Sequence, residues 1–210
     1  MDDAQRMRLA AEYFVAFRPE DAREELRRLS REPKKKVVRY QKPLMLVDSP
    51  GARSRVNYRA PEGFKVWTLG GWRCCYCGQR LVMAHLMELL SLRAPDLLPF
   101  SPGHRYKESF THPAVIRCQP AVDHFESGAR SGKWLESDNL VAACAPCNEP
   151  KNDGLAPPFV PRIFDDWDGG SGVFALLAEG QDRRFARVAR NLQIGIDLAQ
   201  QWRRSSVSSD

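Results

Sequence analysis

The chain has 210 residues, 43% of them hydrophobic and 28% charged, with a formal net charge of +6. These values are typical of a soluble domain with a packed core, and no apolar run reaches the roughly 20 residues that a membrane span needs. The opening "MDDAQRMRLA" lacks the basic and apolar regions of a secretory signal. We therefore expect a cytoplasmic protein without membrane segments, whose positive charge is compatible with a polyanionic partner.

The first 31 residues predict two helices. In "AQRMRLAAEYFVAF" apolar residues recur at helical intervals. Pro19 then opens "PEDAREELRRLS", with acidic residues in the first turn and arginines near the end, as the helix dipole prefers. The basic segment "REPKKKVVRYQK" is interpreted as a solvated linker, with a phosphate-binding arm as the alternative. Residues 1–42 thus form a predicted helical extension.

Residues 43–160 are predicted to hold the functional domain. Turn-forming residues are frequent over 43–66, so we expect irregular structure with short strands there. "WRCCYCGQR" predicts a turn. "LVMAHLMELLSLR" predicts a buried helix, because it is apolar almost all round and Pro95 follows it. Residues 95–114 are expected to form a loop.

Two strands and a short helix are predicted next. "AVIRCQPAVDHF" predicts a strand with a kink at Pro120, and "NLVAAC" predicts a second strand. The connection between them, "FESGARSGKWLESD", is polar. After Cys147 we expect a short helical segment that stops at Gly154.

The C-terminal segment, residues 161–204, is predicted to contain an amphipathic helix over about 181–203. Residues 205–210 are expected to be a disordered, serine-rich tail. Arginines at helical spacing in this helix are interpreted first as a solvated face and second as a stripe facing DNA: Arg183, Arg184, Arg187 and Arg190.

Four cysteines give the strongest signal in the sequence. Cys74 and Cys77 enclose two residues and precede Gly78, and Cys144 and Cys147 enclose two more. Both sulfurs of such a turn can bind one ion, and the glycine accepts the left-handed backbone that brings amides near the sulfurs. The pattern predicts one tetrahedral zinc site, structural because no ligand position is open to substrate. Coincidental spacing is the alternative; a redox pair lacks a thioredoxin-like context.

The spacing does not by itself define the roles of the two remaining cysteines. Cys75 could replace Cys74, although only one residue then separates it from Cys77. Cys118 is expected to pack as a small apolar residue on its strand.

Between the cysteine pairs lie further residues in a defined order. "VDHF" places Asp123 before His124, "NL" begins at Asn139, and "CAPCNEPKN" places Asn148 directly after the last cysteine. In this order residues 74–152 resemble the zinc-containing HNH (His-Asn-His) endonucleases, whose pattern is C-x-x-C, [Asp/Glu/His]-His, Asn-Leu, and C-x-x-C-[His/Asn]-x-x-Lys. The resemblance implies an α+β fold with a ββα-metal core, in which a helix is clamped across two strands.

The resemblance also implies roles. His124 would be the general base that deprotonates the attacking water, Asp123 and Asn148 would hold one Mg²⁺ or Mn²⁺ ion, and Asn139 would tie down the hairpin loop and orient the base. This division suits the chemistry, because phosphodiester hydrolysis needs a cation and a base, and oxygen donors suit a hard ion whereas thiolates suit zinc. Adjacent strand residues point to opposite faces, so Asp123 and His124 can converge only if the chain twists there.

Each of two residues near the last cysteine pair has two possible interpretations. Lys151 is a candidate phosphate contact, and Asn152 is a candidate third metal ligand on the helix face of Asn148. Both can instead be exposed helix residues. Pro150 cannot lie deep in a helix, so either the helix starts near 149 with Asn148 as its cap, or it is distorted.

Other candidates have ordinary explanations. His85 is expected to be a core histidine, and His104 and His112 to be loop residues. The loop after the predicted base offers possible phosphate contacts that can equally be exposed or packed loop residues: Arg130, Lys133 and Trp134.

We therefore expect a metal-dependent HNH nuclease that cleaves DNA, with RNA as an alternative substrate. The wider pattern, followed by a helix ending "LQIGIDLAQQWR", resembles bacterial HNH nucleases of restriction and anti-phage defence, which implies a protein partner such as an ATPase or sensor subunit. The rival hypothesis is a non-catalytic zinc module that binds nucleic acid or a protein. The joint presence of Asp123, His124, Asn139 and Asn148 favours the nuclease, since a binding module does not need that set.

Overall fold

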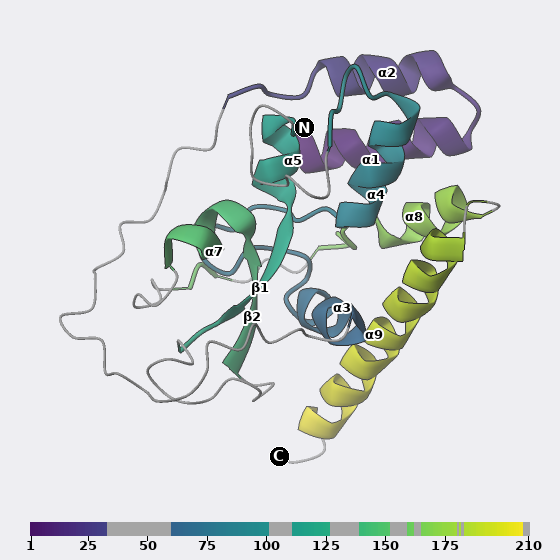
Figure 1. Ribbon diagram of the computed structural model, residues 1–210. Coiled ribbons are helices and arrows are strands. Elements are labelled where there is room, and N and C mark those ends of the chain that lie inside the picture. The colour runs from purple at the N-terminus through teal and green to yellow at the C-terminus, as the bar shows by residue number, and fades with distance from the viewer. Residues whose placement is uncertain are drawn as a thin grey trace.

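The computed structural model describes residues 1–32, 60–100, 111–126, 139–151, 159–161, 165–179, 181 and 183–207. Figure 1 shows that these residues form helices around one small two-stranded antiparallel sheet. The fold class is therefore α+β, as predicted. Among the helices of these ranges, none combines the length and the apolar composition that crossing a bilayer requires.

The two N-terminal helices are those that the sequence predicts. α1 spans Asp3–Val15 and α2 spans Pro19–Arg27. At the start of α1, the Asp2 carboxylate accepts a hydrogen bond from the Gln5 amide at 2.9 Å, and the Gln5 side chain accepts one from the Asp2 amide at 3.0 Å. This capping box satisfies two amides that have no partner within the helix. Pro19 stands at the first position of α2, where its missing N–H costs nothing.

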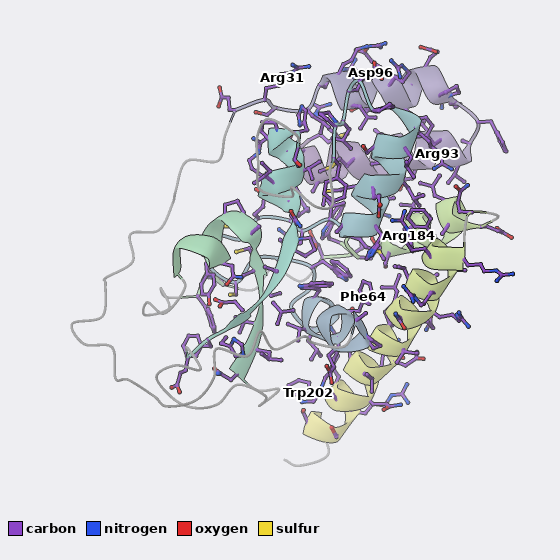
Figure 2. The ribbon with its side chains drawn as sticks, viewed as in Figure 1. Arg31, Phe64, Arg93, Asp96, Arg184 and Trp202 are labelled. Carbon is purple, nitrogen blue, oxygen red and sulfur yellow. The ribbon has the colours of Figure 1, made fainter. Side chains whose placement is uncertain are left out.

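α3 (Ala60–Leu69) and α9 (Arg183–Val207) pack along each other on one side of the molecule (Figure 1). A Cβ atom on Gly195 would lie 2.4 Å from the Phe64 Cβ and 2.7 Å from the Pro61 carbonyl oxygen. In Figure 2, Phe64 lies where α3 meets α9. The close approach of these helices therefore requires a glycine at this position.

α9 confirms the predicted C-terminal helix and continues to Val207, into the segment predicted as a tail. The expectation of irregular structure over residues 60–66 was wrong, because they belong to α3. Pro61 lies in the first turn of α3, where a proline is tolerated, so here it is not a turn signal. The rest of the predicted irregular segment lies outside the described residues.

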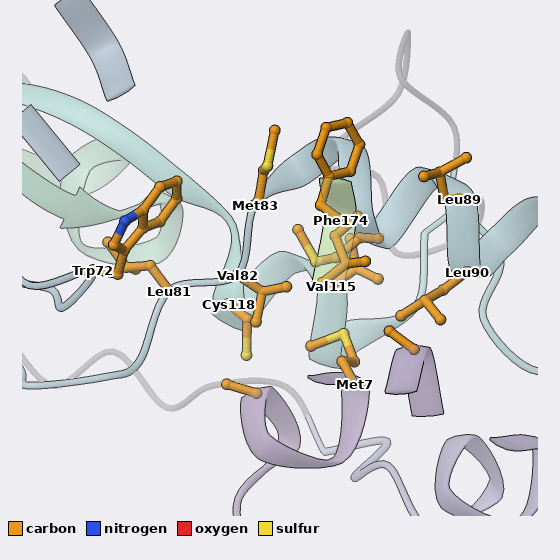
Figure 3. Packing of buried hydrophobic residues seen from close by; sticks show 14 of the residues in the cluster. Met7, Trp72, Leu81, Val82, Met83, Leu89, Leu90, Val115, Cys118 and Phe174 are labelled. Carbon is orange, nitrogen blue, oxygen red and sulfur yellow. The ribbon is translucent and has the colours of Figure 1, made fainter. Parts of the chain in front are cut away.

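α4 (Ala84–Arg93) confirms the predicted buried helix and contacts α1 and α8 (Ser171–Ala178), a helix that the sequence analysis did not single out. Figure 3 shows part of the shared core, to which these three helices contribute Met7, Leu89, Leu90 and Phe174. Residues from all three predicted segments of the chain belong to this one hydrophobic cluster.

The sheet consists of β1 (Pro120–His124) and β2 (Leu140–Cys144). The strands are antiparallel, and Pro120 pairs with Cys144 at one end while His124 pairs with Leu140 at the other. β2 confirms the second predicted strand, and β1 confirms the second half of the first one.

The first half of that predicted strand was wrong, because residues 113–118 form a helix, α5 (Pro113–Cys118). His112 caps it, since its Nδ1 accepts a hydrogen bond from the Ala114 amide at 3.2 Å, and a proline occupies the first helical position. Pro120 marks the start of β1 rather than a kink within a longer strand. Cys118 is buried as predicted, but at the end of this helix.

α7 (Ala145–Lys151) follows β2 directly and contacts both strands. It begins earlier than the helical segment expected after Cys147. In Figure 1, α7 and α3 lie on opposite sides of the hairpin. On the α3 side, the Trp67 indole donates a hydrogen bond to the Ala121 carbonyl at 3.0 Å. The hairpin is thus held between two helices.

Candidate metal centre and its surroundings

The four predicted cysteine ligands lie together. Their sulfur atoms, on Cys74, Cys77, Cys144 and Cys147, are all within 4.8 Å of one another, and the Cys77 and Cys144 sulfurs are 3.8 Å apart. Four thiolates at about 2.3 Å from one tetrahedral ion would be separated by about 3.8 Å. A disulfide needs about 2.05 Å, and all four cysteines are free. The cluster can therefore hold a metal ion such as zinc.

A tight turn presents the first pair of sulfurs. The Gly78 amide donates to the Cys74 carbonyl at 2.8 Å, and the Cys74 amide donates to the Gln79 carbonyl at 2.9 Å. Gly78 has a φ of +70°, which confirms the predicted left-handed backbone after the second cysteine. The cluster joins this turn to the end of β2 and the start of α7.

The backbone of Cys75 fastens the turn to its neighbours. Its amide donates to the Ala142 carbonyl on β2, and its carbonyl accepts from the Val160 amide, both at 2.9 Å. Its side chain does not belong to the four-sulfur group. Burial, followed by the negative charges of Cys74 and Asp123, raises the pKa of this thiol. The ligand is therefore Cys74, and the ambiguity left by the sequence is resolved.

Crowding of the sulfurs changes their acidity. Hydrogen bonds from the thiols of Cys144 and Cys147 lower the pKa of Cys74 to about 7. The pKa of Cys144 is raised, because its thiol hydrogen-bonds with Cys147 and Cys74 and is buried. The proximity of the sulfurs thus shifts the pKa values of Cys74 and Cys144 in opposite directions. A bound divalent cation would favour the thiolate form of all four.

Asp123 is a buried carboxylate beside this turn. Only 7% of its surface is exposed, and its Oδ2 accepts a hydrogen bond of 2.5 Å from the Tyr76 hydroxyl. Tyr76 is 3% exposed and lies between the two cysteines of the turn. The sequence analysis missed Tyr76, because the pattern marks only the cysteines and their glycine.

His124 is the last residue of β1 and is half-buried. The ladder runs without a bulge through Asp123, which pairs with Val141, and through His124, which pairs with Leu140. Successive side chains of a regular strand leave on opposite faces. The pairing therefore contains no irregularity that would turn the two side chains to one face.

Asn139 closes the base of the hairpin loop. Its side-chain amide donates to the Glu126 carbonyl at 2.8 Å, its Oδ1 accepts from the Glu126 amide at 2.7 Å, and its own carbonyl accepts from the Phe125 amide at 2.8 Å. The side chain is buried. It thus joins the two residues that follow β1 to the residue that precedes β2.

Asn148 lies within α7 and is half-buried. Since the helix begins at Ala145, Asn148 is not its cap, and that alternative is wrong. Pro150 falls in the last turn of α7, and Lys151 is the final helical residue. Asn152 lies outside the described residues.

Two aromatic side chains lie near Tyr76. The Phe125 and Phe159 ring centroids are 4.8 Å apart, and that of Phe159 is 6.1 Å from that of Tyr76. Phe125 and Phe159 are 41% and 45% exposed. Aromatic surface therefore borders the buried Tyr76–Asp123 contact.

The remaining histidines and basic residues have ordinary surroundings where they are described. The half-buried His85 packs against the core, with its ring 6.5 Å from that of Phe64 and 6.4 Å from that of Phe174. His112 is a helix cap, and burial lowers its pKa. The four candidate arginines in the first half of α9 are exposed, and Arg184 pairs with Glu88 at 2.9 Å. The other candidates, His104, Arg130, Lys133 and Trp134, lie outside the described residues.

Comparison with protein-family models, with curated proteins and with solved structures found no match to this chain. A fold class alone does not specify a function. Function is therefore inferred from the cysteine cluster and the residues around it.

Proposed function

We propose that this protein is a metal-dependent endonuclease of the HNH type that hydrolyses DNA phosphodiester bonds. The observation that carries the proposal is the cysteine cluster, because its four sulfurs join the turn at residues 74–78 to a β hairpin and a helix. The hairpin carries Asp123 and His124, and the helix that contacts it carries Asn148. A ββα-metal core would have this order of elements.

In this proposal the cluster binds zinc for a structural purpose. All four donors are sulfur, and sulfur donors suit zinc better than a hard cation. With four protein ligands the ion has no position left for water or substrate. The zinc would hold the core together, and the chemistry would take place elsewhere.

Asp123 and Asn148 would hold the catalytic divalent cation, Mg²⁺ or Mn²⁺. A carboxylate and an amide oxygen fit such an ion, and burial of Asp123 restricts its position. The cation, when bound, would neutralise charge on the scissile phosphate. Asn139 would orient the base, and Lys151 is proposed to contact phosphate.

His124 would take a proton from the attacking water as general base. The regular ladder requires that it approach the phosphate from the other face of β1. Two-stranded ribbons twist more strongly than larger sheets. His124 stands at the end of the ribbon, where a phosphate placed at the strand edge can meet residues of both faces.

The same proposal extends to the partners of the protein and to its location in the cell. A net charge of +6 favours a polyanion such as DNA. Reduced thiols fit a cytoplasmic protein, and the resemblance to restriction and anti-phage nucleases suggests a partner such as an ATPase or sensor subunit. The rival is a zinc-binding module that binds nucleic acid or protein without cutting.

A plasmid-nicking assay separates the two functions. Zinc-loaded wild-type protein with Mg²⁺ or Mn²⁺ is expected to nick the plasmid, and His124→Ala is expected to lose at least a hundredfold in rate, as removal of a general base does. His85→Gln, a change of a core histidine, serves as the matched control. Binding of DNA by wild type and His124→Ala without cutting by either would favour the rival. A parallel assay on RNA tests the alternative substrate.

A further inference from the structure

The Tyr76–Asp123 contact links the cysteine turn to the residue on which the proposed catalytic cation depends. We propose that Tyr76 is a positioning residue, through which the zinc-binding turn fixes the carboxylate of Asp123 as a cation ligand. This inference rests on the proposed function, because it takes Asp123 to be that ligand. It adds a residue that the HNH pattern does not contain.

The turn leaves Tyr76 little freedom. Its neighbour Cys77 belongs to the four-sulfur group, and its other neighbour, Cys75, is hydrogen-bonded through its backbone to Ala142 and Val160. The Tyr76 ring is buried and lies near the ring of Phe159. The direction of the phenol is thus set by the same turn that presents the sulfurs.

The hydroxyl of Tyr76 then restricts Asp123. Its hydrogen bond to Oδ2 is 2.5 Å long, in the range of strong bonds from a hydroxyl to a carboxylate. The bond joins residues 47 positions apart, from the turn to β1. It restricts rotation of the carboxylate about its side-chain bonds. Carboxylate ligands of metals are commonly held in this way, and loss of the holding group typically weakens metal affinity 10- to 100-fold.

Manganese binding tests the inference without any need for cleavage. Full-length, zinc-loaded protein is titrated with Mn²⁺, and free Mn²⁺ is followed by electron paramagnetic resonance. We expect one site in the wild type, loss of that site in Asp123→Asn, and about tenfold weaker binding in Tyr76→Phe. Tyr13→Phe removes a hydroxyl from α1 and is expected to bind like the wild type. Zinc content should stay the same in all four proteins.

A purely structural hydroxyl would behave differently. Tyr76→Phe would then melt at a lower temperature but bind Mn²⁺ as tightly as the wild type, and this result would overturn the inference. An absence of Mn²⁺ binding by the wild type would overturn it as well. Introduction of 4-aminophenylalanine at position 76 restores a donor and should recover part of the affinity, and it provides the test if Tyr76→Phe does not fold.

The cutting assay distinguishes this inference from the proposed function. Mn²⁺ binding with the expected effect of Tyr76→Phe, but no cutting of DNA or RNA, would support the positioning role and contradict the nuclease. Cutting by a wild type whose Mn²⁺ affinity does not depend on Tyr76 would contradict only the positioning role.

Discussion

The cysteine cluster and the loop end of the β1–β2 hairpin lie at opposite ends of the same two strands but differ in how their side chains are arranged. The cluster has four identical donors from two C-x-x-C segments, and the four sulfurs meet within 4.8 Å. The hairpin end offers different groups, of which Asp123 is fixed by Tyr76 and His124 leaves the strand on the other face. Both sites join segments that are distant in sequence, but the two C-x-x-C pairs predict the thiolate site, whereas no spacing indicates the contact between Tyr76 and Asp123.

The largest effect should come from the cluster itself. Cys77→Ser removes one sulfur, and we expect loss of zinc and unfolding of the surrounding turn and hairpin, because structural zinc contributes on the order of 10 kcal/mol to the folding of small zinc domains. Cys75→Ser leaves all four cluster sulfurs in place and should retain zinc. Metal analysis and thermal unfolding measure both. Retention of zinc and of the wild-type melting temperature by Cys77→Ser would show that the cluster is not the zinc site.

A change in the helical region should lower stability without affecting the metal. Gly195→Ala places a Cβ atom against Phe64 and the Pro61 carbonyl, and we expect a net loss of about 1–3 kcal/mol, although alanine favours a helix by about 1 kcal/mol. Gln200→Ala, on the exposed face of α9, is the control. Chemical denaturation and zinc content are measured together. A more stable Gly195→Ala protein would contradict the close crossing of α3 and α9.

The hairpin loop should respond to the loss of Asn139. Asn139→Ala removes both side-chain hydrogen bonds to the Glu126 backbone, at a cost of about 1–2 kcal/mol. Hydrogen exchange at the Phe125 and Glu126 amides should become faster, while exchange in α9 should not change. Asn191→Ala on α9 is the matched substitution. Equal protection of the two amides in Asn139→Ala and in the wild type would mean that Asn139 does not hold the loop.

The smallest effect is expected on the exposed face of α9. Arg187→Ala and Arg190→Ala should each change the free energy of unfolding by less than about 0.5 kcal/mol, and they should leave DNA affinity unchanged if this face is only solvated. The affinity is measured over a range of salt concentrations. Weaker binding with a smaller salt dependence would favour the alternative, a stripe that contacts phosphates.

Prediction from sequence succeeded where one local signal was sufficient. The helices α1, α2 and α9 were predicted, and so was the group of four cysteines. Prediction failed where the local sequence favours one secondary structure and the folded chain adopts another. The apolar "AVI" at 114–116 is typical of a strand but belongs to α5, because His112 and Pro113 start a helix there. α3 has a proline at its second residue and contains a glycine that packs beside Trp67, and both were taken for turn signals.

The candidate site was predicted in part for the same reason. The pattern selects Asp123, His124 and Asn139, and the structure places Asn139 in contact with the Glu126 backbone. The partner of Asp123 could not be predicted, because Tyr76 lies 47 residues away and reaches it only through the folded turn. A twist that would bring Asp123 and His124 to one face depends on strand pairing, which the sequence of one strand does not define. The pairing is regular at both residues.

Anomalous scattering from crystals of the zinc-loaded protein soaked in Mn²⁺ tests the central claim most directly, since it locates both metals in one experiment. We expect a zinc peak among the sulfurs of Cys74, Cys77, Cys144 and Cys147, and a manganese peak bound by Asp123 and Asn148. A cluster without zinc, or manganese bound away from Asp123, would contradict the account.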